Sequence, residues 1–136
     1  MADLAEGQKA PAFTLPASTG GKTSLRDFAG KQHVVLYFYP RDMTPGCTQE
    51  ACSFRDLRSE CERAGAAIRG VSTDDLGSHS KFAEAHDLSF PLLSDADAKV
   101  ATKYGVWKEK RRYGRTYMGI ERTTFVMDKA GVIRRV

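Results

Sequence analysis

The sequence lacks any apolar run that approaches the about 20 residues needed for a membrane-spanning helix. Its first residues also lack the basic stretch followed by an apolar block that marks a secretory signal, so we expect a cytoplasmic protein with no membrane partner. No internal repeat, low-complexity tract or interdomain linker is visible. The length of 136 residues and the 28% share of charged residues are typical of one folded domain, here residues 1–136.

Cysteine is scarce and histidine is scattered, which argues against a disulfide framework and against a metal site. An odd number of cysteines cannot all pair with one another, and a reducing compartment would keep them as thiols. The spacing between the first two cysteines is wider than common zinc motifs use. The residues concerned are Cys47, Cys52 and Cys61, with His33, His79 and His86. We therefore expect no metal and no cofactor. The remaining functional interpretation of the cysteines is reactive thiol chemistry.

Basic residues only slightly outnumber acidic ones, which gives a net charge of +4 and a pI near 9.0. The densest basic run, residues 108–112 with Arg115 beyond it, is short and is interrupted by a glutamate. No nucleic-acid-binding motif accompanies it. We expect an exposed loop on a solvated surface and no nucleic-acid partner.

A strand, a helix and a second strand are predicted in the first half of the chain. Residues 33–39 are apolar on both faces, as in a central strand that is buried on both sides. From Thr48 onward apolar residues recur every three or four positions, at 51, 54, 57 and 61, and Gly65 ends this helix. Residues 66–72 form the next strand. Such a βαβ unit makes the two strands parallel.

The remaining elements complete a mixed sheet covered by helices, a small α/β sandwich. Residues 10–16 and 22–25 predict an N-terminal hairpin, and residues 25–28 predict a short turn. Asp74 or Asp75 is expected to cap a second helix that ends near His86. Later elements are a strand at 90–93, a third helix at 95–103, one alternating strand at 118–127, and a turn at 128–131 into residues 132–136.

Cys47 lies at the junction between the buried strand at 33–39 and the helix that follows it. Unpaired N–H groups and the helix dipole at that position favour a thiolate over a thiol. In sheets of this kind, reactive groups also gather beyond the carboxyl ends of the parallel strands. We interpret Cys47 as a nucleophile, and the alternative is an inert buried thiol.

The residues around Cys47 resemble the active site of the peroxiredoxins. Pro40, Thr44 and Cys47 have the spacing of that family's signature, and residues 44–52 (TPGCTQEAC) resemble the bacterioferritin-comigratory-protein or peroxiredoxin Q branch, of the atypical two-cysteine type. Further similar segments run along nearly the whole chain, at residues 7–11, 37–40, 72–74, 91–95, 105–107 and 122–125. The resemblance implies a thioredoxin-like fold and thiol-dependent reduction of hydrogen peroxide and organic hydroperoxides, with a role in antioxidant defence.

The same resemblance implies roles for particular residues. Cys47 would be the peroxidatic cysteine, which becomes a sulfenic acid. Arg122 would approach its sulfur and polarise the peroxide, a task that suits a side chain that stays charged. Thr44 would hydrogen-bond the peroxide, although as a residue before a helix it could equally be a turn or capping residue.

Three further residues are expected to support this centre. Pro40 would shield the sulfur without donating a hydrogen bond. The amide of Cys47, and that of Gly46 beside it, would stabilise charge that develops on oxygen. Glu50 would orient the arginine. By itself, Arg122 would be interpreted as a solvent-facing residue of an alternating strand, so the family resemblance alone assigns its role.

The resemblance to this branch also implies that Cys52 is the resolving cysteine and forms an intramolecular disulfide with Cys47. On an ideal helix, five residues rise about 7.5 Å and turn about 500°, which separates the two Cα atoms by almost 9 Å. A disulfide needs less than about 7 Å, so we expect the first turns of the helix to unwind. Cys61 is interpreted as a small core residue, or alternatively as a second resolving thiol.

Two other functions fit the same fold and remain as alternatives. A thioredoxin-type disulfide oxidoreductase would require a Cys-x-x-Cys motif, which the sequence lacks. A binding module without activity is also compatible with the fold. The resemblance implies a monomer recycled by thioredoxin or a glutaredoxin-like dithiol. The resemblance also implies a further C-terminal helix, so either the sequence is truncated at Val136 or the protein lacks that helix, and we expect the former.

Overall fold

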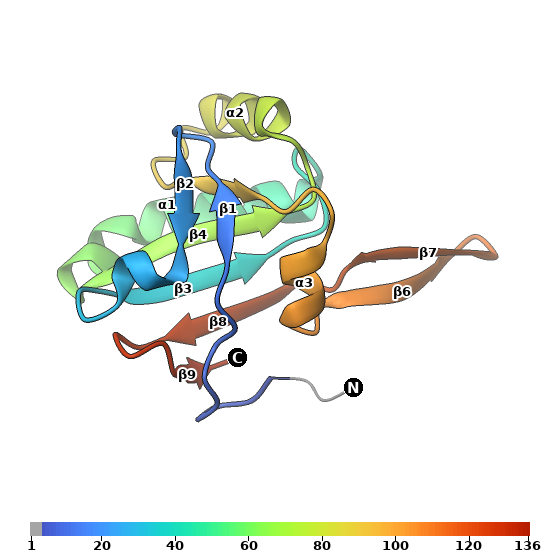
Figure 1. The fold of residues 1–136 in the computed structure, drawn as a ribbon. Coiled ribbons are helices and arrows are strands. Elements are labelled where there is room, and N and C mark those ends of the chain that lie inside the picture. Colours follow the sequence, from blue (N-terminus) through green and yellow to red (C-terminus); the bar gives the residue numbers. More distant parts are fainter. Residues whose placement is uncertain (1–3) are drawn as a thin grey trace.

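A five-stranded mixed sheet forms the centre of the molecule in the computed structural model, which describes residues 4–136 (Figure 1). β3 pairs in parallel with β4 and antiparallel with β8, and this confirms the mixed sheet predicted from the sequence. In spatial order the strands are β5 (Leu92–Ser94), β4 (Ala66–Ser72), β3 (His33–Phe38), β8 (Thr123–Met127) and β9 (Ile133–Arg135).

β3 is buried on both faces, as its apolar sequence predicts. Val34, Leu36 and Phe38 belong to the core that contains the N-terminal hairpin and α3 (Lys99–Lys103). Tyr37 and Tyr39 face the other core, beneath α1 (Pro45–Arg63) and α2 (Leu76–Ala85). Figure 1 shows α1 behind the sheet, with the hairpin and α3 in front of it. The fold is the predicted thioredoxin-like sandwich.

α1 begins three residues earlier than the periodicity indicated. Thr44 is the N-cap and Pro45 is the first helical residue, a position where a missing N–H group costs nothing. At the other end Gly65 has a φ of 77°, which suits the residue that terminates a helix. Leu57 departs from the predicted apolar face: it is 45% exposed, whereas Ala51 and Phe54 pack onto the sheet.

α2 begins where predicted, because the Asp75 side chain accepts a hydrogen bond from Ser78 N–H at 2.8 Å. The next two elements are displaced. The strand predicted at 90–93 is β5, and the helix predicted at 95–103 begins only at Lys99. The Asp95 carboxylate explains the late start, since it accepts the N–H groups of Val100 and Ala101 while still outside the helix.

The largest difference from the sequence expectation is a second hairpin near the C-terminal end. β6 (Trp107–Arg112) and β7 (Arg115–Ile120) replace the expected basic loop and the first part of the expected 118–127 strand. Tyr113 and Gly114 form its two-residue turn with positive φ angles of 51° and 74°. The strand breaks at residues 121–122 because Ile120 pairs with Trp107, whereas Thr123 pairs with Phe38.

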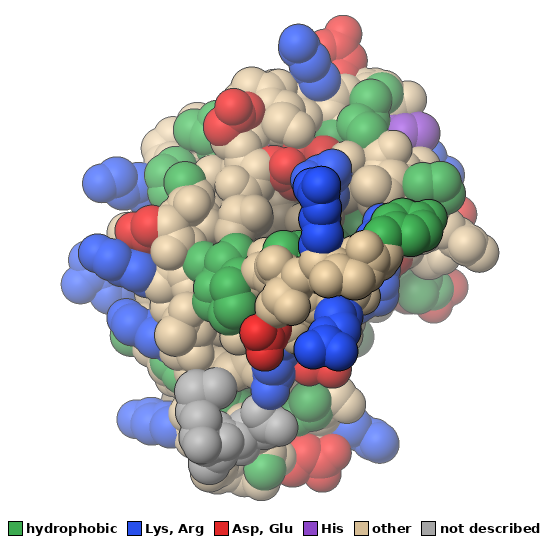
Figure 2. Space-filling model, turned by 90° about the vertical axis from the view of Figure 1, so that its right-hand side faces the viewer, with side chains coloured by type: hydrophobic (Ala, Val, Ile, Leu, Met, Phe, Trp, Pro, Cys, Tyr) green, Lys and Arg blue, Asp and Glu red, His purple; other side chains and the backbone are tan. Residues whose placement is uncertain are grey.

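This hairpin extends away from the sheet in Figure 1. Figure 2 views the molecule from that side and shows Lys and Arg side chains interspersed with apolar ones on this face. Arg111, Arg112 and Arg115 are exposed, as expected, whereas Lys108 and Lys110 are half-buried. All five lie on the strands β6 and β7. The large side chains Tyr113, Tyr117 and Met118 are exposed on the same hairpin.

The terminal hairpins follow the sequence more closely. β1 (Thr14–Pro16) pairs antiparallel with β2 (Lys22–Ser24), and the short turn that follows is the 3-10 helix η1 (Leu25–Phe28). At the other end β8 and β9 are joined by a turn at residues 128–131. None of the helices within residues 4–136 combines the length and apolar character that crossing a membrane requires.

Candidate active site

Cys47 lies in the first turn of α1, directly beyond the carboxyl end of β3. Its side chain is only 1% exposed and packs with Tyr37, Tyr39 and Ala51. The Thr48 N–H group donates to Thr44 O at 2.8 Å. The amides of Gly46 and Cys47 precede this bond and therefore have no acceptor one turn back in the helix. The sulfur thus sits beside the partial positive charge of a helix N-terminus.

The Arg122 guanidinium reaches this sulfur from the break between β7 and β8. Its Nη2 donates to Cys47 Sγ at 3.2 Å, and its Nη1 donates to Glu50 Oε1 at 2.7 Å. Cys47 and Glu50 are three positions apart on α1 and so share one helix face. The structure therefore brings together the cysteine, the arginine and the glutamate that the sequence singled out.

The ionisation of Arg122 and Glu50 follows from this contact. Burial opposes the charge of Arg122, but the hydrogen bond with Cys47 and the charge of Glu50 outweigh it, so the pKa of Arg122 is raised. Burial raises the pKa of Glu50, and the nearby Arg122 opposes that change. The guanidinium consequently provides a fixed positive charge at the sulfur.

Thr44 and Pro40 lie on the loop before α1. Thr44 does not cap the helix with its side chain, and its Oγ1 donates instead to Arg41 O at 3.0 Å. Both residues border a hollow of about 370 Å³ between this loop and the β6–β7 hairpin. Its other lining includes apolar Trp107 and Ile120 and basic Lys110. The hollow thus adjoins the loop that leads into α1.

Gly46 has a second property that sequence reasoning missed. A Cβ atom at this position would lie 3.3 Å from Arg122 Nη2, closer than ordinary van der Waals contact. The φ of Gly46 is not positive, so the backbone would accept another residue there. The absence of a side chain is what lets the guanidinium approach the helix.

Cys52 and Cys61 lie farther along the same helix, and both are half-buried free thiols. α1 is continuous from Pro45 to Arg63, so Cys47 and Cys52 are held at helical spacing. That spacing is too wide for a disulfide. Cys61 packs at the margin of the core that contains Cys47.

Sequence reasoning assigned no role to Asp42 and His79, which form a buried pair next to the active-site loop. His79 Nδ1 lies 2.7 Å from Asp42 Oδ2. No local pattern could reveal this contact, because the two residues are 37 positions apart. Together with Asp74 they form the one cluster in the described part of the chain that could hold a metal ion. Its carboxylate oxygens already accept hydrogen bonds from side chains and backbone.

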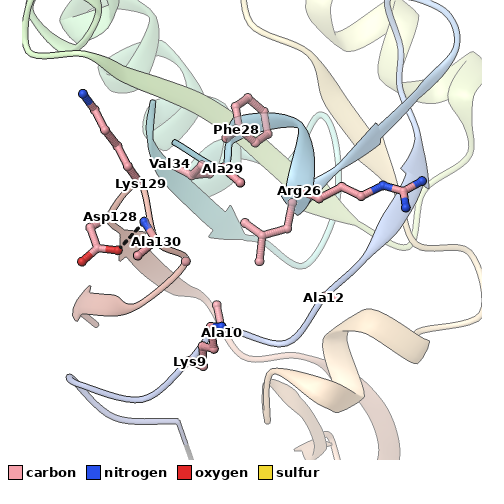
Figure 3. A pocket seen from close by; sticks show the side chains of 12 residues that line it. Lys9, Ala10, Ala12, Arg26, Phe28, Ala29, Val34, Asp128, Lys129 and Ala130 are labelled. Atoms are coloured by element: carbon pink, nitrogen blue, oxygen red, sulfur yellow. Dashed lines mark hydrogen bonds between the residues drawn. The ribbon is translucent and has the colours of Figure 1, made fainter. Parts of the chain in front are cut away.

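A second hollow, of about 310 Å³, lies at the opposite end of β3 (Figure 3). Val34 and Phe28 line it, together with the turn between β8 and β9 and the segment before β1. None of the candidate site residues borders it. The chemistry therefore concerns the end of the sheet where α1 begins.

Comparison with known proteins points to one family along the whole described chain. The model of the AhpC/TSA family matches residues 6–136. A putative peroxiredoxin bcp from Coxiella burnetii is 52% identical over 96% of this chain and 85% of its own length. Peroxiredoxin Bcp from Bacillus subtilis is 51% identical over 92% of this chain and 79% of its own length.

Solved structures give the same result. A cysteine-to-serine mutant of Xylella fastidiosa PrxQ has a TM-score of 0.91 and 34% identity, with coverage of 99% of this chain and 86% of that one. The bacterioferritin comigratory protein of Xanthomonas campestris has a TM-score of 0.85 and 41% identity, over 90% of this chain and 78% of that one. The Xanthomonas protein was studied for its alkyl peroxide reduction activity.

Proposed function

The chain belongs to the AhpC/TSA family as a peroxiredoxin of the Bcp/PrxQ type, a thiol-dependent peroxidase, and from this we propose how its own residues carry the reaction. The contact between Arg122 Nη2 and Cys47 Sγ, at 3.2 Å, is the observation that carries the proposal. This contact holds the permanent positive charge of the guanidinium beside the Cys47 thiol, which also lies at a helix N-terminus.

In the first step the Cys47 thiolate attacks one oxygen of the peroxide. A sulfur–oxygen bond forms and the O–O bond breaks, so that Cys47 is oxidised to a sulfenic acid. The other oxygen leaves as an alkoxide or hydroxide and takes up a proton, which yields an alcohol or water. The Arg122 guanidinium and the amides of Gly46 and Cys47 are positioned to stabilise the charge on that oxygen.

Thr44 and Pro40 act around the reacting atoms. The hydroxyl hydrogen of Thr44 is engaged with Arg41 O, so its oxygen lone pairs are free to accept the O–H of a peroxide. Pro40 offers no N–H group that could compete for the sulfur. Glu50 fixes the guanidinium by accepting from Nη1. Each residue thus has a separate task in the same step.

In the second step the Cys52 thiol attacks the sulfur of the sulfenic acid. A Cys47–Cys52 disulfide forms and water leaves. Because the intact helix holds the two residues too far apart, the first turns of α1 must unwind before this step. A dithiol protein such as thioredoxin or a glutaredoxin-like protein then reduces the disulfide by thiol exchange, and it acts on a monomer in the cytoplasm.

Organic hydroperoxides are proposed substrates beside hydrogen peroxide. The hollow of about 370 Å³ next to Pro40 and Thr44 offers apolar surface from Trp107 and Ile120 for an organic group. The reported alkyl peroxide reduction by the Xanthomonas relative supports this choice. Cumene hydroperoxide and hydrogen peroxide should therefore both be consumed.

The test is peroxide consumption by the purified protein with dithiothreitol, compared with Cys47→Ser. The proposal requires a rate well above that of the Cys47→Ser variant, and equal rates would favour a binding module. After one equivalent of peroxide, mass spectrometry should find a disulfide between Cys47 and Cys52, with Cys61 still a free thiol.

The assignment of the resolving cysteine has its own test. With thioredoxin as reductant, Cys52→Ser should stop after a single turnover, whereas the matched variant Cys61→Ser should continue. Continued turnover by Cys52→Ser would contradict the role of Cys52. Amide exchange over residues 47–55 should be faster in the oxidised protein than in the reduced one. Equal exchange would contradict unwinding.

A further inference from the structure

The loop between β3 and α1 is anchored by a buried pair of side chains, Asp42 and His79. Asp42 is 4% exposed and His79 is fully buried, which is unusual for groups that can carry charge. Asp42 stands two residues before the N-cap Thr44, and His79 lies on α2. The pair therefore connects the active-site loop to α2.

Both ring nitrogens of His79 lie within hydrogen-bond distance of an acceptor. Nε2 lies 3.0 Å from the Leu93 carbonyl oxygen, which can only accept. Nδ1 lies 2.7 Å from Asp42 Oδ2. Burial opposes the ionisation of Asp42, but hydrogen bonds from His79 and Tyr39 outweigh it and hold the pKa of Asp42 below its ordinary value. Each ring nitrogen of His79 thus faces an acceptor, and the side chain links Asp42 to β5.

Asp42 gathers further contacts that fix the loop in place. The Tyr39 hydroxyl donates to Oδ1 at 2.5 Å, and the Ser78 hydroxyl donates to Oδ2 at 2.8 Å. Its backbone N–H donates to Asp74 Oδ2 at 2.8 Å. One loop residue is thus bonded to the residue that follows β3, to α2 and to the segment that joins β4 to α2.

The residue after Asp42 shows why such an anchor is needed. Met43 has a φ of 66°, a left-handed conformation that is strained for a residue other than glycine. The chain then reaches Thr44 and enters α1. The contacts of Asp42 oppose this strain and hold the chain where it turns from the loop into the first turn of α1, which contains Cys47.

We propose that His79 is a positioning residue for Cys47: through Asp42 it holds the 40–44 loop and the first turn of α1 in the geometry for peroxide attack. This inference depends on the proposed role of Cys47. Since the same turn must unwind before Cys52 can react, the pair favours attack and opposes resolution. Weakening it should slow the formation of the sulfenic acid and speed the formation of the disulfide.

Two substitutions of similar size separate the two hydrogen bonds of His79. In His79→Asn the amide nitrogen replaces Nδ1 and retains the donor to Asp42, whereas in His79→Gln it replaces Nε2 and retains the donor to Leu93. In a Cys52→Ser background, His79→Gln should lower the second-order rate constant of Cys47 oxidation about tenfold, and His79→Asn at most about threefold. Equal rates for both variants and the parent, or the reverse ranking, would overturn the proposal.

The second half of the inference is measured with Cys52 present. After rapid oxidation of Cys47, disulfide formation should be about threefold faster in His79→Gln than in the parent protein. An unchanged or slower rate would contradict the link to unwinding. If the parent protein shows no oxidation of Cys47, the proposed function itself fails, which is a different outcome from unchanged His79 variants.

Two further measurements do not depend on whether His79→Gln folds. Ser78→Ala removes one donor to Asp42 from the surface of α2 and should lower the oxidation rate about two- to threefold. Nitrogen-15 NMR of histidine should show a proton on Nδ1 of His79, hydrogen-bonded to Asp42. An Nδ1 without a proton, or stoichiometric binding of Mn²⁺ that Asp42→Asn abolishes, would overturn the proposal.

Discussion

The guanidinium of Arg122 lies 3.2 Å from the sulfur of Cys47, although 75 positions separate the two residues. The same guanidinium is held by Glu50 at 2.7 Å, so it forms two directed hydrogen bonds at once. A planar fork of donors can satisfy both acceptors, which a single ammonium group cannot do with the same geometry.

Replacement of Arg122 by lysine should therefore lower the second-order rate constant of Cys47 oxidation by about ten- to a hundredfold, although the charge is conserved. Stopped-flow oxidation in the Cys52→Ser background measures this rate. Arg111→Lys, on the exposed β6 strand, is the matched control and should leave the rate unchanged. A rate for Arg122→Lys equal to that of this control would show that charge alone suffices.

Gly46→Ala should affect stability and reactivity in opposite directions. Alanine in the first turn of a helix stabilises it by up to about 1 kcal/mol relative to glycine. The new methyl group would lie 3.3 Å from Arg122 Nη2 and push the guanidinium away from the sulfur. We expect an unchanged or higher free energy of unfolding together with an oxidation rate about threefold lower.

Gly77→Ala on α2 is the control for Gly46→Ala, because its nearest neighbour would be Asp75 Oδ1 at 3.4 Å and not a catalytic group. It should gain similar helix stability without a loss of rate. If Gly46→Ala reacts as fast as the parent protein, the close approach of Arg122 is not limiting.

The Asp128 carboxylate should make the β8–β9 turn sensitive to acid. Its pKa is lowered by hydrogen bonds from the N–H of Val132 and from Arg134, among others. A lowered pKa in the folded state means that the carboxylate stabilises the protein above about pH 4 and that this stabilisation is lost as the pH falls through the folded-state pKa. Asp128→Asn should thus have a lower free energy of unfolding at pH 7.

Urea denaturation of Asp128→Asn and the parent protein across that pH range measures this effect. The difference in the free energy of unfolding should close as the medium becomes acidic, and high salt should reduce it at pH 7, since Arg134 is largely exposed. A difference that is constant with pH would assign the effect to the amide and not to the charge.

Tyr37→Phe should stabilise the protein. The Tyr37 hydroxyl is fully buried and has no hydrogen-bond partner within the described residues, while its ring stacks on Phe54. Phenylalanine keeps the stacking and removes the unsatisfied group, so we expect a gain of about 1 kcal/mol in the free energy of unfolding.

Tyr39→Phe is the contrasting control, because that hydroxyl does donate to the Asp42 carboxylate. Its loss should cost about 1.5–3 kcal/mol, the range for hydrogen bonds to charged groups. Chemical denaturation of both variants gives the comparison. Destabilisation by Tyr37→Phe would indicate that an ordered water molecule satisfies its hydroxyl.

The periodicity of apolar residues was sufficient to predict elements that are consecutive in the chain. The two-sided apolar run of β3, the helical spacing in α1 and the following strand predicted the βαβ unit, because periodicity depends only on neighbouring residues. The alternation at 118–127 misled for the same reason. The alternation continues across residues 121–122, although the partner strand changes there. Before the break the chain pairs with β6, and after it with β3.

The sequence by itself determined that Cys47 stands at a strand-to-helix junction, with Glu50 on the same helix face, since both facts follow from spacing along one segment. The approach of Arg122, the space that Gly46 leaves for it, and the pairing of Asp42 with His79 were decided by the tertiary structure. Charged residues usually face solvent, and only the packing of distant elements brings one of them against a specific partner. The thiol is a local feature of the chain, and its electrostatic setting is a property of the fold.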